Sequence, residues 1–337
     1  MYFFFLHIVL TNAEGHDNIT YITSMFSMKY ILKNGCDNMS VLDLVGNTPL
    51  VELCGISRNL NDVKVFAKAE FCNPSGSVKD RAARAMLLAG IQSGALTKKK
   101  TILDATSGNT GIAYAMIGAA LGYKVKLFLP SNSSLERKRM MHLFGAEIVE
   151  TDPLEGSDGA FLKARALALK EADIYFYPNQ YDNPVNPNAH YETTGVEIWK
   201  QTTGKVTHFI TGMGTSGTFM GVTKRLKEYN KEIKAIAVQP NSPFHGIEGT
   251  KHMLSTIQPG IYDPAAADGI LHIGTEDAYE MTRRLAREEG LFVGISSGGN
   301  VFATLELAKT LPHGSVVVTM LCDGGTRYLS DTFWEEK

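Results

Sequence analysis

The amino-acid sequence predicts an α/β fold in which mainly parallel sheets are covered by helices and divided between two subdomains. Short, continuous apolar runs such as 124–130 and 315–321 are typical of strands buried on both faces. Helical segments of roughly 10 to 15 residues separate these runs, an alternation typical of βαβ units. Pro178, Pro184 and Pro187 punctuate the middle of the chain, where we expect the crossing between subdomains.

The composition is that of an ordinary globular protein. The 337 residues include 33 Lys and Arg against 35 Asp and Glu, a net charge of −2, and 44% of the residues are hydrophobic. A chain of this length buries a substantial core, so intrinsic disorder and fibrous repeats are not expected. The near-neutral charge gives no electrostatic reason to expect nucleic acid or a membrane surface as a partner. A small-molecule partner is therefore expected.

The cysteines and the N-terminus indicate in which compartment of the cell the protein is expected. The four cysteines lie far apart without a C-x-x-C pair, which predicts reduced thiols and no metal site (Cys36, Cys54, Cys72 and Cys322). The apolar first ten residues are too short to span a bilayer and lack the positive charges of a secretory signal. We expect a cytoplasmic protein without a membrane segment.

Residues 1–38 differ from the rest of the chain. They mix aromatic, Asn, Asp and Met residues without a helical or strand period. Two interpretations are equally supported: a poorly ordered N-terminal extension, or a true start at Met39. The alternation of strands and helices begins near Val41.

The elements follow one another in a regular order. A strand at 101–107 runs into a glycine-rich turn and a helix, and the strand at 124–130 ends at Pro130. The next helix starts at Ser133 or Ser134 and ends at Gly145. The remaining predicted elements are a strand at 146–152, a helix at 159–172, a strand at 174–179, a strand, loop and helix at 208–230, a strand at 233–240, a helix at 275–290 and a strand at 315–321.

Lys79 lies where a turn meets a helix, within FCNPSGSVKDRAARAM at 71–86. A lysine held at such a junction can be aimed into a cleft, and partial burial makes the neutral amine that forms a Schiff base accessible. The alternative is an ordinary helix start, although a positive lysine there is slightly unfavourable against the helix dipole. This stretch alone leaves both interpretations open.

Two glycine loops each join a predicted strand to a helix. ATSGNTGIAYA, at 105–115, places hydroxyls and an amide beside the free N–H groups of a helix start, which suits a carboxylate. TGMGTSGTFMG, at 211–221, contains no lysine and matches neither the P-loop nor the dinucleotide pattern, so it suits one phosphate monoester. The alternative interpretation of 105–115 is a capped helix start, and that of 211–221 is a tight turn that needs glycine.

A fourth segment, GISSGGN at 294–300, opens a helix and taken alone is an N-cap. Because the carboxyl ends of parallel strands meet at one edge of a sheet, we expect all four segments to converge on one crevice. That crevice would combine an aldehyde-reactive amine, a phosphate-binding loop and a carboxylate-binding loop. These are the contacts that pyridoxal phosphate and an amino acid require.

Several short motifs occur together in a recognisable order: VGNTPL (45–50), NPSGSVKDRA (73–82), TSGNTGIA (106–113), GMGTSGT (212–218), GISSGG (294–299) and RYLS (327–330). With them the chain, from about Met39 to Asp331, resembles cysteine synthase, most closely the B-type O-acetylserine sulfhydrylase branch of the fold type II (tryptophan synthase β-like) pyridoxal-phosphate enzymes. The resemblance implies α/β subdomains, expected at 39–190 and 191–337, with the cofactor in the cleft between them.

The resemblance also implies a role for each matching residue. Lys79 would form the Schiff base with pyridoxal 5′-phosphate and remove the substrate Cα proton. Asn109 would hydrogen-bond the cofactor's 3-hydroxyl oxygen, and Ser296 its pyridine nitrogen. The cofactor phosphate would be held by Gly214, Thr215, Ser216, Gly217 and Thr218. The substrate carboxylate would be bound by Thr106, Ser107, Asn109 and Thr110, with Gln180 as a further candidate.

The activity implied is a β-replacement that forms L-cysteine. O-acetylserine or O-phosphoserine would lose its leaving group from Cβ to give an α-aminoacrylate, to which sulfide adds. A neutral serine at the pyridine nitrogen cannot hold a proton there as aspartate would, which favours prompt elimination. A homodimer is implied as well, with the amino-acid donor and the sulfur source as small-molecule partners.

Some segments depart from the family pattern or carry no clear assignment. Asp323-Gly324-Gly325-Thr326-Arg327-Tyr328 stands where Asp-Ser-Gly-Glu-Arg-Tyr is frequent, and Val196 stands where proline is common. Neither departure touches Lys79 or the phosphate loop. In FHGIEGTKHM, Lys251 or His252 either meets an anionic leaving group or is a solvated loop charge.

Three other functions compete with this one. Cystathionine β-synthase shares the core loops and uses homocysteine; we expect no regulatory or haem-binding region here, because nothing follows Lys337 and the first 40 residues show no haem-ligand motif. Serine or threonine dehydratases usually carry phenylalanine before the lysine, where this chain has Val78. A non-catalytic scaffold is disfavoured because Lys79 and all the cofactor loops are present.

Overall fold

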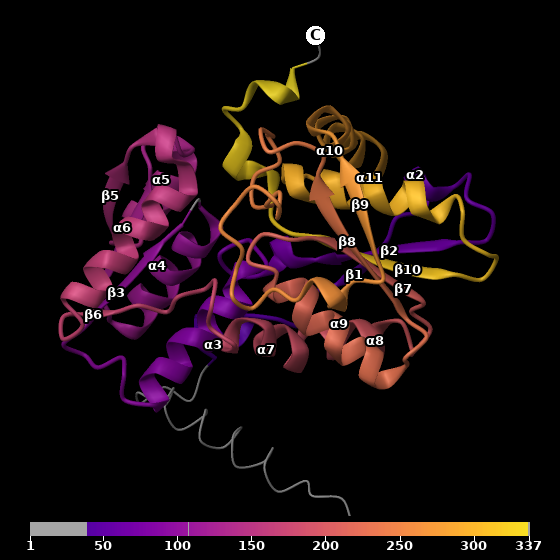
Figure 1. Cartoon of the computed structure of the whole chain (residues 1–337). Coiled ribbons are helices and arrows are strands. Elements are labelled where there is room, and N and C mark those ends of the chain that lie inside the picture. The colour runs from indigo at the N-terminus through magenta and orange to yellow at the C-terminus, as the bar shows by residue number, and fades with distance from the viewer. Residues whose placement is uncertain (1–38, 107, 336–337) are drawn as a thin grey trace, which may run out of the picture. The chain divides into compact units, whose positions relative to one another are not determined.

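The computed structural model describes residues 39–106 and 108–335, so the extension at 1–38 and Ser107 lie outside the described residues. The strands of these residues form two sheets (Figure 1). The six-stranded sheet contains, in spatial order, β1 (Leu50–Glu52), β2 (Lys64–Ala69), β10 (Val316–Leu321), β7 (His208–Gly212), β8 (Lys234–Pro240) and β9 (Gly269–Ile273). The four-stranded sheet contains β5 (Glu147–Thr151), β4 (Val125–Pro130), β3 (Thr101–Ala105) and β6 (Tyr175–Phe176).

Helices cover these sheets. They are α2 (Cys54–Ser57), α3 (Lys79–Gln92), α4 (Asn109–Leu121), α5 (Leu135–Leu143), α6 (Gly156–Lys170), α7 (Val185–Glu192), α8 (Thr194–Gln201), α9 (Gly217–Tyr229), α10 (Thr275–Glu289) and α11 (Ile295–Ala308). Around the six-stranded sheet, α10 and α11 lie on one face and α8 and α9 on the other (Figure 1). Predicted helix ends are confirmed where a cap is present: Ser134 precedes α5 and accepts from the Arg137 N–H, and Gly290 ends α10 in the left-handed conformation at φ 67°.

The prediction of mainly parallel, doubly covered sheets is confirmed. The β1–β2 pair is antiparallel, and every other strand pair of the described residues is parallel. Along β10, Val317 and Leu321 join the core beneath α10 and α11, whereas Val318 and Met320 join the core on the α8 and α9 side. Successive side chains of a strand point to opposite faces, so a strand with two buried faces needs a continuous apolar run.

The sheet topology differs from the subdomain limits expected at 39–190 and 191–337. β1 and β2 belong to the six-stranded sheet, where β2 pairs with β10 from the other end of the chain. Residues 41–69 therefore share a sheet with the C-terminal half, while 101–176 supply the four-stranded sheet. Hydrophobic periodicity identifies a strand without identifying its partner, which is why the sequence could not place β1 and β2.

A buried cluster of charged side chains fixes α3, the helix that begins with Lys79. Arg81 Nε lies 2.7 Å from Glu70 Oε2, and Arg81 Nη1 lies 2.7 Å from Glu197 Oε1. Lys68 completes the cluster, with its Nζ 2.6 Å from Glu197 Oε2. Lys68 and Glu70 are fully buried and Arg81 is 3% exposed. Two cations and two anions thus neutralise one another away from water and tie α3 to β2 and α8.

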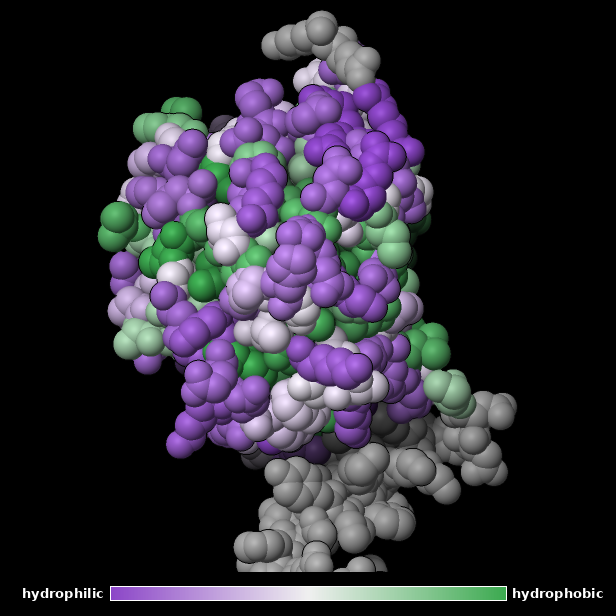
Figure 2. Space-filling model, turned by 90° about the vertical axis from the view of Figure 1, so that its right-hand side faces the viewer, coloured by the Kyte–Doolittle hydropathy of each residue, from purple (hydrophilic) through white to green (hydrophobic). Residues whose placement is uncertain are grey.

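One face of the molecule is mainly polar. On the face drawn in Figure 2, hydrophilic side chains predominate and hydrophobic ones gather in small groups between them. Among residues 39–106 and 108–335, no helix is both long enough and apolar enough to cross a lipid bilayer.

Candidate active site

The turn before α3 holds Lys79 in place. Asp80 is fully buried and accepts hydrogen bonds from the Ser75 N–H, at 2.7 Å, and from the Ser75 hydroxyl. The Val78 N–H donates to the carbonyl of Cys322 at 2.8 Å, which ties the turn to the end of β10. Burial raises the pKa of the Asp80 carboxyl to about 6. Lys79 itself is partly buried.

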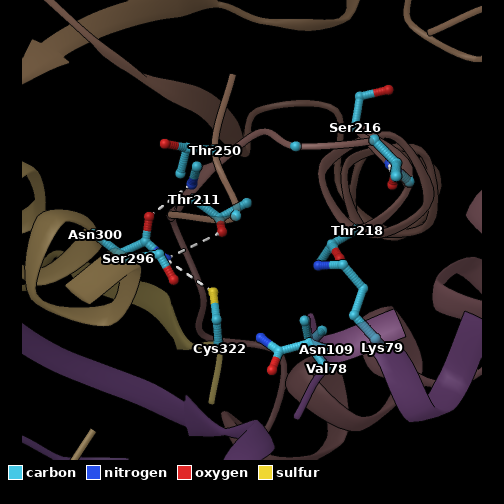
Figure 3. A pocket seen from close by; sticks show the side chains of 15 residues that line it. Val78, Lys79, Asn109, Thr211, Ser216, Thr218, Thr250, Ser296, Asn300 and Cys322 are labelled. Atoms are coloured by element: carbon cyan, nitrogen blue, oxygen red, sulfur yellow. Dashed lines mark hydrogen bonds between the residues drawn. The ribbon is translucent and has the colours of Figure 1, made fainter. Parts of the chain in front are cut away.

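The predicted convergence of the four segments is confirmed by a cavity that residues from all four line. The lining residues lie at the starts of helices and in loops: Lys79 at the start of α3, Asn109 at the start of α4, the loop between β7 and α9, Ser296 at the start of α11, and Cys322 after β10. In Figure 3 the side chains of Lys79 and Asn109 lie across the cavity from Ser296 and Asn300. The carboxyl ends of β3, β7 and β10 all lead into this space, as expected for a ligand site in a parallel α/β protein.

The loop after β7 brings Gly214, Thr215, Ser216, Gly217 and Thr218 to the cavity wall. Ser216 has the left-handed conformation (φ 68°) and is 2% exposed. Its buried hydroxyl has no hydrogen-bond partner within the described part of the chain. A Cβ on Gly214 would collide with the carbonyl of Gly249, so the close approach of these two loops requires glycine.

Helix α7 supports this loop from behind. Asn186 Nδ2 donates to Thr215 Oγ1 at 3.1 Å, and His190 Nε2 lies 3.2 Å from Thr218 Oγ1. Burial lowers the pKa of His190 to about 3, so its imidazole is neutral at physiological pH. These two residues were not identified from the sequence. Their only signal was the spacing of four residues, which places them on one face of a helix.

The loop after β3 lines an adjoining cavity, together with Lys79. Thr106 Oγ1 accepts from the N–H groups of Gly108 and Gly111, at 3.0 and 3.1 Å, so this hydroxyl also organises the loop. Thr110 Oγ1 donates to Gln180 Oε1 at 2.8 Å, and Gln180 Nε2 donates to the carbonyl of Ala105 at 2.9 Å. Thr106, Thr110 and Gln180 all line this cavity. Asn109, which was also predicted as a carboxylate ligand, lines the first cavity and is not among the residues lining this one. Ser107, a further predicted carboxylate ligand, lies outside the described residues.

Ser296 occupies the first turn of α11 and is 7% exposed. Cys322 lines the same cavity as Ser296, and burial raises the pKa of its thiol to about 11. Asn300, one turn further along α11, accepts from the Gly212 N–H at 2.7 Å and donates to the carbonyl of Met320 at 3.0 Å. Asn300 and Cys322 line the cavity, yet neither was predicted, because their positions depend on contacts between distant segments.

Lys251 lies at the second cavity, and His252 is not among its lining residues. Lys251 Nζ is 3.0 Å from Asp158 Oδ1 and 5.1 Å from the centre of the Tyr181 ring. Only 8% of Lys251 is exposed. It is therefore a buried, paired cation and not a solvated loop charge.

The residues present fit pyridoxal phosphate. A phosphate monoester beside the loop at 214–218 would meet the unpartnered Ser216 hydroxyl and the N-terminus of α9, where backbone N–H groups are free. Lys79 supplies a partly buried primary amine that lines the same cavity. Lys79, Asn109, Ser296 and the loop would hold the group, and Thr106 and Thr110 would face an amino acid attached to it.

Comparisons with known proteins agree with this fit. A family model described as "Pyridoxal-phosphate dependent enzyme" matches residues 41–323. Cysteine synthase from Aquifex aeolicus is 49% identical over 303 residues, which cover 88% of this chain and 93% of that relative.

Solved structures give the same result. Cysteine synthase from Entamoeba histolytica superposes with a TM-score of 0.84 and 36% identity, covering 90% of this chain and 93% of the other. An O-acetylserine-dependent cystathionine β-synthase from Helicobacter pylori superposes with a TM-score of 0.84 and 34% identity, covering 89% of this chain and 100% of the other. The sequence match, the two-sheet fold and the cavity together show that this chain belongs to the family of pyridoxal-phosphate-dependent enzymes.

Proposed function

We propose that this chain is a cysteine synthase that forms L-cysteine from O-acetylserine and sulfide. The observation that carries the proposal is the joining of two cavities at Lys79: one has the features of a phosphate and ring site, and the other has those of an amino-acid carboxylate site. The 49% identity to a cysteine synthase over most of both chains supports the same activity. The family resemblance also supports a cytoplasmic homodimer, which we include in the proposal.

Each side chain has a defined task in this reaction. When bound, pyridoxal phosphate supplies an aldehyde for the substrate amine and a ring that withdraws electrons from Cα. The amine of Lys79, released from the aldehyde, would take the proton from Cα. Thr106 and Thr110, with Ser107, would orient the carboxylate, and the loop at 214–218 would anchor the phosphate. Loss of acetate from Cβ, addition of sulfide there and return of a proton to Cα would complete the replacement.

The charge around Lys251 favours a donor whose ester group is uncharged before it leaves. Lys79 and Lys251 are the cations among the described residues that line the second cavity, and Asp158 neutralises Lys251. Apart from Lys79, which the proposed reaction uses, a dianionic phosphate would find no uncompensated cation among the described residues that line this cavity, whereas the acetyl ester needs none. We therefore expect the ratio kcat/KM to favour O-acetylserine over O-phosphoserine at least about tenfold, a difference of about 1.4 kcal/mol.

The experiment measures cysteine formation from both donors with sulfide, and repeats the assay with homocysteine. Asp158→Asn frees the Lys251 ammonium and should raise relative use of O-phosphoserine about fivefold, whereas Asp152→Asn, at an exposed position away from Lys251, should leave it unchanged. Faster turnover of homocysteine than of sulfide would replace our proposal with cystathionine β-synthase. Equal use of both donors by the wild type would contradict the charge argument.

Ser296 is expected to set the course of the reaction. Its neutral hydroxyl cannot stabilise a protonated pyridine ring, so charge does not accumulate there and the leaving group departs promptly. Because a shift of one pKa unit is worth about 1.4 kcal/mol, Ser296→Asp should slow the elimination severalfold and produce a long-wavelength absorbance band during turnover. Ser296→Ala, which adds no charge, should show no such band. If Ser296→Asp keeps wild-type rates and an unchanged spectrum, Ser296 acts only as a helix cap and the assignment is wrong.

A further inference from the structure

The segment at 323–328 holds the amide of Asn109 from behind the cavity. Arg327 Nη1 donates to Asn109 Oδ1, and Asn109 Nδ2 donates to Asp323 Oδ2 at 2.6 Å. The hydroxyl of Tyr328 donates to the same Asp323 oxygen at 2.7 Å. Asp323 is fully buried and Arg327 is 2% exposed. Both ends of the amide thus have a charged partner, which fixes which end carries the oxygen.

The same arginine holds the turn that presents Lys79. Arg327 Nη2 donates to the carbonyl of Ser75, the residue whose N–H binds Asp80. A Cβ on Gly76 would lie 2.8 Å from Arg327 Nη2, so the guanidinium packs directly against the turn. Arg327 therefore joins the two segments of the chain that carry Lys79 and Asn109, and it lines neither cavity itself.

We propose that Arg327, assisted by Asp323, is a positioning residue that orients the Asn109 amide for the cofactor. The inference rests on the proposed function, because it takes from that proposal the role of Asn109 as donor to the cofactor's 3-oxygen. An amide has one acceptor and two donor hydrogens. Arg327 engages the acceptor and Asp323 takes one hydrogen, which leaves the second hydrogen for the cavity that Asn109 lines. If the Asn109 amide were turned by 180°, its Oδ1 would instead face Asp323 Oδ2, and two acceptor oxygens would oppose each other.

The test compares binding of pyridoxal phosphate and of 3-deoxypyridoxal phosphate, which lacks that oxygen, to protein stripped of cofactor. The wild type should prefer pyridoxal phosphate about tenfold, the effect of one hydrogen bond to a charged oxygen. Arg327→Lys keeps the positive charge but cannot donate to Asn109 and to the Ser75 carbonyl at the same time, as the guanidinium does. The preference for pyridoxal phosphate should therefore fall to about twofold. Affinity for the deoxy compound should change little, because the phosphate loop is untouched.

The matched control is Arg283→Lys. Arg283 also anchors the C-terminal segment, with Nη1 donating to the carbonyl of Phe333 at 2.6 Å, but no contact joins it to Asn109. This variant should keep the tenfold preference. Asn109→Ala should abolish the preference, and adding Arg327→Lys to it should change nothing further, since the arginine acts through the amide.

A folded Arg327→Lys protein that keeps the full preference would overturn the inference. If that variant does not fold, Tyr328→Phe, which removes only the hydroxyl that steadies Asp323, should lower the preference about threefold. An unchanged preference in Tyr328→Phe would then overturn it. A wild type that shows the preference but makes no cysteine would refute the proposed function alone, and one that makes cysteine without the preference would refute this inference alone.

Discussion

Lys79→Ala is expected to lower the rate of cysteine formation by at least about a thousandfold, because one amine both carries the cofactor and moves the Cα proton. The other amine at the described cavity walls, Lys251, is paired with Asp158 and is not available as a base. The loss should appear in kcat at saturating donor and sulfide, measured on protein reconstituted with pyridoxal phosphate.

Two controls separate this effect from a general defect. Lys309→Ala removes an exposed lysine at the end of α11 and should leave turnover unchanged. Added methylamine should restore part of the activity of Lys79→Ala, because a free amine can enter the space that the side chain vacates. Unchanged turnover in Lys79→Ala would end the mechanism described here.

Glu70→Ala should lower the free energy of unfolding by about 3–5 kcal/mol, because it leaves the charge of Arg81 buried without its main partner. Denaturant unfolding of wild type and variant gives this difference. Glu288→Ala breaks an exposed ion pair with Arg284 on α10 and should change stability by less than about 1 kcal/mol. If the two substitutions lower the free energy of unfolding by similar amounts, the buried cluster stabilises the fold no more than an exposed ion pair does.

The contribution of Glu70 should also depend on pH. Burial alone would raise the pKa of this carboxyl, but the adjacent Arg81 guanidinium outweighs it and lowers the pKa from 4.5 to about 2. A carboxyl with a lowered folded-state pKa stabilises the fold fully above its unfolded pKa and loses that effect as the pH falls. The stability difference between wild type and Glu70→Gln should therefore shrink between about pH 5 and pH 2. A constant difference across this range would contradict the assignment.

Local sequence patterns predicted the parts of the site that depend on neighbouring residues. Lys79, Asn109, the loop at 214–218 and Ser296 each follow a strand or turn and begin a helix. Strand ends of a parallel sheet meet at one edge, so their convergence followed from the order of the elements. The shared cavity confirms that reasoning.

Contacts between distant segments could not be predicted in this way. The pairing of Lys251 with Asp158 joins residues 93 positions apart, and the hydrogen bond between Asn109 and Asp323 spans 214 positions. Such pairs depend on how sheets and loops pack, and hydrophobic periodicity carries no information about that. The same limit explains why β1 and β2 had no predicted sheet partners and why Arg327 had no predicted role.

The unusual segment at 323–328 now has a structural explanation. Thr326, which stands where glutamate is frequent, is exposed, while Asp323, Arg327 and Tyr328 are buried around Asn109. The second departure, Gly324, stands where serine is frequent, and its N–H donates to the carbonyl of Gly76 at 3.3 Å, in the turn before Lys79. Asp323, Arg327 and Tyr328, whose side chains surround Asn109, match the family pattern.

The central claim is that Lys79 binds pyridoxal phosphate covalently at the junction of the two cavities. Reducing the holoenzyme with borohydride makes this bond permanent, and mass spectrometry of the digested protein then identifies the modified residue. We predict that the pyridoxyl group lies on Lys79, in the peptide that contains NPSGSVKDR. A group on another lysine such as Lys251, or no modified peptide from protein that forms cysteine, would contradict the account.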